Sequence, residues 1–326
     1  MRKLLILAAV LISVVGLSAG GAVFWGYKAY TSPGPLTEDT RILVKPGQGL
    51  RQIAHNLQNA GVIEQDWLFS LAARLSEKHT ALKAGEYEFA AHISPEGALD
   101  KLVRNETVVR SITIPEGLTS PAVWALLQGE DTLGGELGPP AAEGSLLPET
   151  YHFSYGDDRK ALVRRMTDSM AALRQELWPS RQENLPFKSW EEAVTLASIV
   201  EKETALASER PMIARVFINR LRKGMRLQSD PTVVFALTGG EGELGRPLTR
   251  QDWKIDNPYN TYVIRGLPPG PIANPGRAAL AAVLQPAETD ALYFVADGQG
   301  GHAFAKTLRQ HNRNVARWRK IKANGG

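Results

Sequence analysis

Residues 42–57 read ILVKPGQGLRQIAHNL, a short apolar strand, a Pro-Gly turn and a segment with apolar residues at helical spacing. The same order recurs in residues 87–103, YEFAAHISPEGALDKLV, and in residues 112–127, ITIPEGLTSPAVWALL. Short strands that alternate with amphipathic helices are typical of mixed folds. The repeated pattern therefore predicts the fold class α+β.

Downstream of this repeat, apolar residues return mainly at helical spacing. Residues 128–145 are rich in Gly, Pro and acidic residues and are predicted to form a loop. The predicted helices are residues 159–177, 189–204, 210–222 and the basic segment 307–322, with a strand at residues 291–296.

An uncharged apolar run occupies residues 4–27, LLILAAVLISVVGLSAGGAVFWGY. A bilayer core needs roughly 20 apolar residues in a helix. Arg2 and Lys3 precede the run, and aromatic residues suited to the membrane interface end it. The run predicts a transmembrane helix with residues 1–3 in the cytoplasm. A cleaved signal peptide is the alternative, but the apolar run continues past its small residues.

Composition excludes several kinds of chemistry. The chain has 326 residues, no cysteine and a net charge of +4, without a long basic run that would indicate nucleic acid. Its six histidines show no metal-ligand spacing, and no G-x-S-x-G motif is present. Residues 240–245 match G-x-G-x-x-G, but Pro247 follows and two glutamates would repel phosphate. We expect no metal, no cofactor and no nucleic-acid partner.

One glutamate has the environment of a general acid. On a helical wheel of residues 192–204, EAVTLASIVEKET, Glu203 falls roughly 50° from the centre of the apolar face, and Glu201 roughly 110° away. Apolar surroundings and the negative end of the helix dipole would both raise the pKa of Glu203. A protonated glutamic acid can act as a general acid. The alternative is a boundary glutamate paired with Arg210 or Arg215.

Several long segments resemble one known family. The chain is similar to the MltG/YceG-like endolytic murein transglycosylases in residues 148–151 (PETY), 197–204 (ASIVEKET), 216–235, 257–276 and 293–312. Many members have Asp where this chain has Glu149, and Tyr where it has Phe235. Glu149 keeps the carboxylate of Asp and differs only in how far the carboxylate reaches. Phe235 lacks the hydroxyl of Tyr, so a contact made by that phenol is in question.

The resemblance implies a reaction and a location. Glu203 would cleave the β-1,4 bond between N-acetylmuramic acid and N-acetylglucosamine in nascent peptidoglycan, leaving 1,6-anhydro ends. The chain would be a single-pass inner-membrane protein with a periplasmic ectodomain, and its partners would be glycan strands and the cell-wall synthesis machinery. The alternatives are a water-adding muramidase and a non-catalytic, membrane-anchored peptidoglycan-binding scaffold.

The implied organisation has five parts. After residues 1–3 and the helix at 4–27, a linker at 28–40 leads to a LysM-like subdomain at 41–110 and a catalytic domain at 111–326. The strand–turn–helix units resemble LysM-like modules, which bind amino-sugar polymers.

Ten further residues are predicted to frame the substrate. For most of them a purely structural role in a turn, a strand or the core is the alternative. They are Glu149, Tyr151, Asn219, Gln228, Asp230, Thr232, Tyr259, Asn260, Thr261 and Tyr262.

Overall fold

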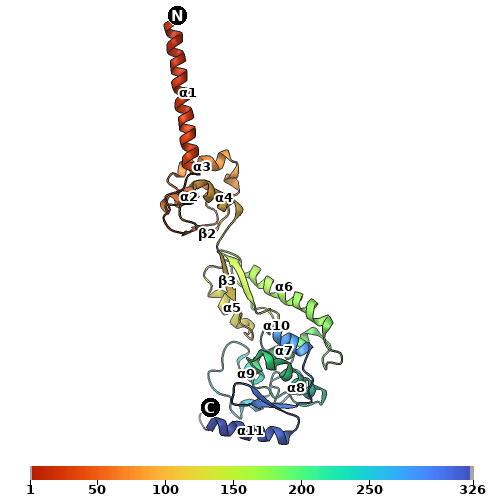
Figure 1. The fold of residues 1–326 in the computed structure, drawn as a ribbon. Coiled ribbons are helices and arrows are strands. Elements are labelled where there is room, and N and C mark those ends of the chain that lie inside the picture. The colour runs from red at the N-terminus through yellow and green to blue at the C-terminus, as the bar shows by residue number, and fades with distance from the viewer. Residues whose placement is uncertain (1, 324–326) are drawn as a thin grey trace. The chain divides into compact units, whose positions relative to one another are not determined.

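The computed structural model describes residues 2–323 and separates into two compact units (Figure 1). The N-terminal unit runs through Arg110 and includes Phe153–Gly156. The C-terminal unit comprises Ser111–His152 and the chain from Asp157 onward. Helices and short strands alternate in both, so the α+β fold class is confirmed.

The first helix, α1 (Arg2–Thr31), is apolar and long enough to cross a membrane. It continues beyond the predicted end at residue 27 because the next helix-breaking residue is Pro33. Gly34 then donates its backbone N–H toward the Ile93 carbonyl at 3.1 Å, in a space that a Cβ would fill. Leu36 enters the hydrophobic core. The expected linker at 28–40 is therefore partly helix and partly packed against the N-terminal unit.

The N-terminal unit combines an antiparallel strand pair with helices. β1 (Thr40–Val44) pairs with β2 (Gly85–Phe89) in the register Thr40 with Phe89. The helices are α2 (Leu50–Asn59), α3 (Asp66–Leu75), α4 (Pro95–Arg104) and the short η1 (Lys78–Thr80). Their apolar faces enclose a core that includes Leu57, Phe69, Tyr87, Phe89 and Leu99. Two predicted strand–turn–helix units are confirmed here, while glycan binding by this unit stays a prediction.

The third strand–turn–helix unit is also confirmed, as β3 (Val109–Thr113) followed by α5 (Ser120–Gln128). β3 pairs with β4 (Thr150–Ser154). The predicted loop at residues 128–145 contains only the end of α5 and no further helix or strand.

The remaining elements belong to the C-terminal unit, and the helices predicted there are confirmed within a few residues. They are α6 (Arg159–Leu177), α7 (Trp190–Glu203), α8 (Arg210–Arg222), α9 (Asp230–Thr238), α10 (Arg277–Leu284), α11 (Leu308–Ala323), β5 (Tyr293–Ala296) and β6 (His302–Ala305), with short η2 (Trp178–Ser180), η3 (Ala207–Glu209) and η4 (Asp252–Lys254).

Helix α7 is the centre of this unit and places the site. Ser189 caps its first turn by accepting a hydrogen bond from Glu192 N. The helix packs against α8 and α10, and its residues from Ala193 to Glu201 are all buried. A helix that is buried all round in this way carries its last residue, Glu203, to the edge of the core.

Candidate active site

Glu203 ends α7 and meets a polar loop. Its half-buried side chain accepts a 2.5 Å hydrogen bond from Ser229 Oγ. Burial raises the pKa of Glu203 to about 7, and the negative charge of Asp230 also raises it. The Ser229 hydrogen bond and the positive charges of His302 and Arg220 lower the pKa, but burial outweighs them. Glu203 can therefore hold a proton near neutral pH.

Two threonines fix Ser229 in place. Ser229 is 1% exposed, and its backbone N–H donates to Thr261 Oγ1 at 3.0 Å. Thr232 Oγ1 donates to the Ser229 carbonyl at 2.7 Å and lies 2.8 Å from Thr261 Oγ1. Thr232 and Thr261 are both fully buried. The structure brings these two predicted residues close to Glu203, where they hold Ser229.

The neighbouring residue, Gln228, has a positive φ of 52° and an exposed side chain. Its backbone N–H donates to the Thr261 carbonyl at 3.2 Å. The structure therefore uses the backbone of this predicted residue to shape the turn and leaves its side chain at the surface.

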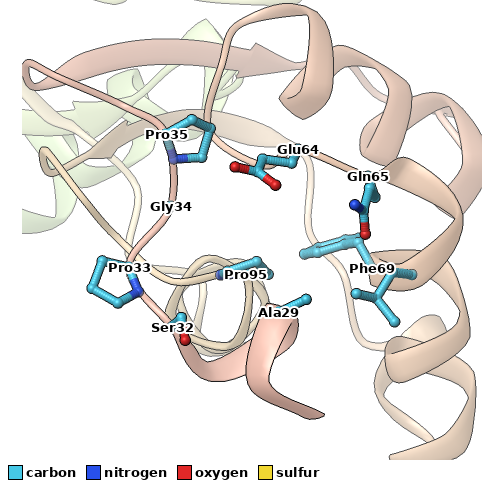
Figure 2. A pocket seen from close by; sticks show the side chains of 10 residues that line it. Ala29, Ser32, Pro33, Gly34, Pro35, Glu64, Gln65, Phe69 and Pro95 are labelled. Atoms are coloured by element: carbon cyan, nitrogen blue, oxygen red, sulfur yellow. The ribbon is translucent and has the colours of Figure 1, made fainter. Parts of the chain in front are cut away.

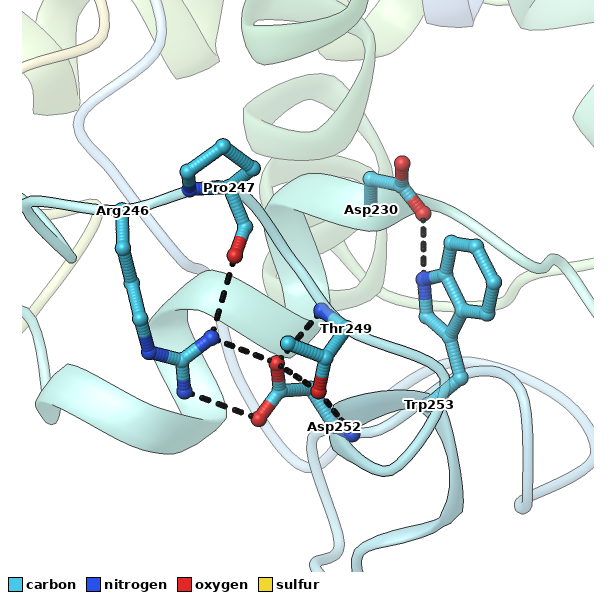
Figure 3. Close-up of polar contacts among 6 residues, drawn as sticks. All are labelled: Asp230, Arg246, Pro247, Thr249, Asp252 and Trp253. Carbon is cyan, nitrogen blue, oxygen red and sulfur yellow. Dashed lines mark hydrogen bonds and ion pairs between the residues drawn. The ribbon is translucent and has the colours of Figure 1, made fainter.

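Asp230, whose charge acts on Glu203, joins two aromatic rings, and Figure 3 shows its contact with the first of them, Trp253. Asp230 Oδ1 accepts hydrogen bonds from Trp253 Nε1 at 3.0 Å and from Tyr262 OH at 2.7 Å. The two rings stack with centroids 5.6 Å apart and an interplanar angle of 23°. Burial and the Asp230 carboxylate raise the pKa of Tyr262, so this phenol remains a hydrogen-bond donor.

Hydrogen bonds from Arg246 and Thr249 to Asp252 hold the loop that carries Trp253 (Figure 3). Arg246 binds both carboxylate oxygens of Asp252 at 2.7 and 3.0 Å, and Thr249 donates its backbone N–H at 2.6 Å and its hydroxyl at 2.8 Å. These hydrogen bonds hold the pKa of Asp252 well below its usual range. Asn260, which is fully buried, donates to the Trp253 carbonyl at 3.2 Å and accepts from Tyr262 N at 3.0 Å. Asn260 thus ties the two aromatic residues together through their backbones.

A groove opens next to Asp230. Its volume is about 320 Å³, and its lining includes Lys202, Asp230, Phe235, Gly240 and Ile272. The Phe235 ring lies 4.8 Å from the Tyr259 ring, so the predicted residue Tyr259 is linked to the groove through Phe235. The groove reaches Glu203 only through its neighbours, because Lys202 precedes Glu203 in the chain and the charge of Asp230 acts on it.

Three predicted residues make contacts elsewhere. The side-chain amide nitrogen of Asn219 donates two hydrogen bonds, to the Thr289 carbonyl at 2.8 Å and to the Ala291 carbonyl at 3.0 Å. Tyr151 is 8% exposed and donates to the Leu147 carbonyl at 2.7 Å, while Glu149 is exposed beside β4. The contacts of these three residues do not include Glu203, Ser229 or Asp230.

The second glutamate of the helix end, Glu201, has a different environment. Its side chain is 4% exposed, pairs with Arg210 at 2.7 Å and accepts the Gly276 N–H at 2.9 Å. Arg210 also binds Glu116 at 3.0 Å. These contacts make Glu201 part of a buried structural network.

Sequence patterns did not identify four residues of this site. Ser229 and Trp253 contact the predicted residues directly, and Arg220 and His302 act on Glu203 through their charge. His302 is held by Glu209, 2.7 Å from its Nδ1. Ser229 lies between the predicted residues Gln228 and Asp230, and Trp253 lies shortly before the predicted residue Tyr259. This closeness in sequence is the only signal that points to them. Within residues 2–323, no three His, Asp or Glu side chains gather as metal ligands would.

Together, the fold and the site define a mixed α/β protein with an apolar N-terminal helix and a glutamic acid whose pKa is near neutrality. The chain belongs to the YceG-like family, whose model matches residues 42–317.

Relatives with assigned names are similar over most of the chain. The endolytic murein transglycosylase of Streptococcus pneumoniae (strain D39) is 30% identical over 357 residues, covering 92% of this chain and 62% of the relative. The endolytic murein transglycosylase of Bacillus subtilis is 29% identical over 338 residues, covering 91% of this chain and 90% of the relative. The chain thus spans less than two thirds of the pneumococcal protein.

A solved structure supports the fold. A crystal structure of a YceG-like protein from Listeria monocytogenes matches with a TM-score of 0.52 and 31% identity, covering 85% of this chain and 98% of that one.

Proposed function

We propose that this chain is a membrane-anchored endolytic lytic transglycosylase of peptidoglycan, with Glu203 as its catalytic acid and base. The observation that carries the proposal is the Glu203 carboxyl itself, with its pKa raised to about 7 and with its neighbours Lys202 and Asp230 lining an open groove. The names of the pneumococcal and Bacillus relatives supply the substrate class, a murein glycan strand.

In this mechanism Glu203 acts twice. It first gives its proton to the oxygen that links N-acetylmuramic acid to N-acetylglucosamine, and the bond from C1 to that oxygen breaks. The C6 hydroxyl of the same muramic acid forms a new bond to C1, and the Glu203 carboxylate takes the hydroxyl proton. The product is a 1,6-anhydro end, and no water is added. Attack within one sugar gains the advantage of a tethered nucleophile.

The surrounding residues support these steps. Ser229 fixes the direction of the Glu203 carboxyl through the 2.5 Å hydrogen bond. The stacked pair of Trp253 and Tyr262 offers an aromatic surface suited to a sugar ring. Asp230 holds both rings, and its negative charge adds to the effect of burial in raising the pKa of Glu203. Thr232 and Thr261 are positioning residues, because they act through Ser229.

We further propose the location and the partners. Helix α1 crosses the inner membrane with its N-terminus in the cytoplasm, and the catalytic unit is periplasmic, where nascent strands are made. The N-terminal unit, residues 41–110, serves as a LysM-like glycan-contacting module. Proximity to the membrane would bring the enzyme to the cell-wall synthesis machinery.

The test uses the full chain and purified peptidoglycan. The Glu203→Gln variant is expected to fold but to release no anhydro-muropeptides in product analysis by mass spectrometry. Glu191→Gln is the matched control, because Glu191 is an exposed glutamate in the first turn of the same helix. Full product release by Glu203→Gln would refute the assignment.

A water-adding muramidase is the second candidate, favoured by one observation. A hydrolase needs a second carboxylate, and Asp230 lies close enough to Glu203 to raise its pKa. Product masses separate the two functions, since the hydrolytic product is heavier by one water and has a reducing end. Binding of peptidoglycan without any product would instead indicate a non-catalytic scaffold.

A further inference from the structure

Helix α3 exposes a stripe of large apolar side chains. Trp67, Leu71 and Leu75 are 55%, 46% and 77% exposed. They are four residues apart, so they share one face of the helix. The opposite face is buried in the core through Phe69 and Ala73. Exposed apolar stripes on a soluble surface are unusual and indicate a binding partner.

This stripe lies against the C-terminal part of α1. The rings of Trp25 and Trp67 stack with centroids 6.3 Å apart and an interplanar angle of 19°. A Cβ placed on Gly26 would lie 3.7 Å from Leu68 Cδ1. An apolar groove of about 460 Å³ runs between the two helices, lined by Val23 and Tyr27 of α1 and by the α3 stripe.

The contact fixes the depth of α3 relative to a bilayer. At 1.5 Å per residue, the apolar run of residues 4–27 is about 36 Å long. The hydrocarbon core is about 30 Å thick, so Trp25 and Tyr27 fall at the membrane interface when α1 spans it. Trp67 is stacked on Trp25 and therefore lies at the same level.

The segment that follows α1 packs against the same N-terminal unit as α3. A pocket of about 130 Å³ lies there. Figure 2 shows its lining, in which Ala29 of α1, Ser32–Pro35, Gln65 and Phe69 near the start of α3, and Pro95 of α4 come together. The backbone hydrogen bond from Gly34 to Ile93, described above, fixes the same segment.

Charge around the stripe fits a lipid headgroup region. Arg51 and Arg74 line a second hollow together with Trp67 and Leu71. Basic residues beside an apolar helix face attract anionic headgroups. Asp66 lies in the same hollow, and its carboxylate is 3.6 Å from His55 Nδ1.

We propose that the α3 stripe is a membrane-contact surface, inserted at the headgroup boundary of the bilayer that α1 crosses. The partner is the lipid itself, because the groove is continuous with the membrane-spanning helix and is almost wholly apolar in its lining. The proposal rests on the anchoring role of α1 and is independent of the reaction at Glu203.

The absence of cysteine makes a direct test possible. Single cysteines at Leu71, Leu75, Ile12 or Lys45 would carry a spin label in the full chain, reconstituted in vesicles of phosphatidylethanolamine and phosphatidylglycerol. Lys45 is the control, since it is exposed at the end of the β1 strand and away from α3 in the sequence. We expect the labels at Leu71 and Leu75 to be several-fold less accessible to an aqueous nickel relaxant than the label at Lys45, and more accessible to oxygen.

Each other outcome overturns the proposal. Equal nickel accessibility at Leu71, Leu75 and Lys45, with the Ile12 label deep in lipid, would leave the anchor intact and refute membrane contact by α3. A water-accessible Ile12 label would refute the anchor and the proposal together. Dipolar broadening between Leu71 labels would indicate that a second copy covers the stripe instead of lipid.

Discussion

Ser229 Oγ donates a 2.5 Å hydrogen bond to Glu203 Oε1, although 26 residues of sequence separate the two. This hydrogen bond lowers the pKa of the carboxyl, whereas burial raises it, and the resulting pKa is about 7. The serine hydroxyl thus fixes the direction of the acid and partly offsets the effect of burial on its pKa.

Replacing Ser229 by Ala should move the alkaline limb of the pH–rate profile to higher pH. The lost hydrogen bond stabilised the ionised carboxylate, so without it Glu203 keeps its proton to a higher pH. Activity near neutrality should still fall, because the carboxyl is no longer aimed. The measurement is kcat/KM for anhydro-muropeptide release across pH 5 to 9, in which the wild-type rate should decline above about 7.

A suitable control for that experiment is Ser198→Ala. Ser198 is also a buried serine, on α7, but its Oγ accepts from Ile272 N at 3.0 Å and does not contact Glu203. Its loss should lower stability without moving the alkaline limb. An unchanged limb in Ser229→Ala would contradict the assigned balance.

Replacing Asp230 by Asn should shift the same limb in the opposite direction. The negative charge of Asp230 raises the pKa of Glu203, so its removal favours the ionised form of Glu203. Asn keeps an oxygen that can accept hydrogen bonds from Trp253 and Tyr262, so the aromatic pair should stay in place. A pH profile of the variant tests the shift, and a limb at unchanged or higher pH would contradict it.

The sequence predicted the framework of this site better than its contacts. Helical periodicity placed α7 within one residue of each end and put Glu203 at the edge of its buried face. The same method cannot pair Glu203 with Ser229, because the pairing depends on how the loop before α9 folds back. Ser229 itself stands between the predicted residues Gln228 and Asp230, which have side chains that are more exposed.

Residue type alone does not determine which partner a polar side chain binds. An amide suits an N-acetyl group, yet the side-chain amide of Asn219 donates to the backbone carbonyls of Thr289 and Ala291. Buried polar groups must find hydrogen-bond partners within the protein, so an amide among apolar residues can have a structural role as well as a ligand-binding one. Only the spatial position of the loop at residues 289–291 distinguishes the two roles.

Glu201→Gln should lower stability and spare the chemistry. The substitution removes a buried charge that faces Arg210, and breaking such a pair costs about 3 kcal/mol. Glu116 still binds Arg210, and Gln can accept the Gly276 N–H, so the loss should be about 2 kcal/mol in denaturant unfolding. Glu116→Gln is the control and should cost about 1 kcal/mol or less, because Glu116 is 40% exposed. Loss of turnover by a fully folded Glu201→Gln protein would give this residue a catalytic role instead.

Glu203→Gln should stabilise the protein at alkaline pH, even though it removes activity. The folded-state pKa of Glu203, about 7, lies above its ordinary value of 4.5, so the folded chain binds the proton more tightly. This group therefore stabilises the fold fully below pH 4.5 and costs stability as the pH rises from 4.5 through 7. Gln is neutral throughout and can still accept the Ser229 hydrogen bond.

The difference between variant and wild type should consequently depend on pH. At pH 8 the free energy of unfolding of Glu203→Gln should exceed that of the wild type by about 3 kcal/mol. At pH 4.5 the two should be nearly equal, because both side chains are then neutral in the folded state. Urea unfolding at both values, with Glu191→Gln alongside, measures the effect. A variant that is less stable than the wild type at pH 8 would mean that the folded protein favours ionised Glu203, and the general-acid role would lose its physical basis.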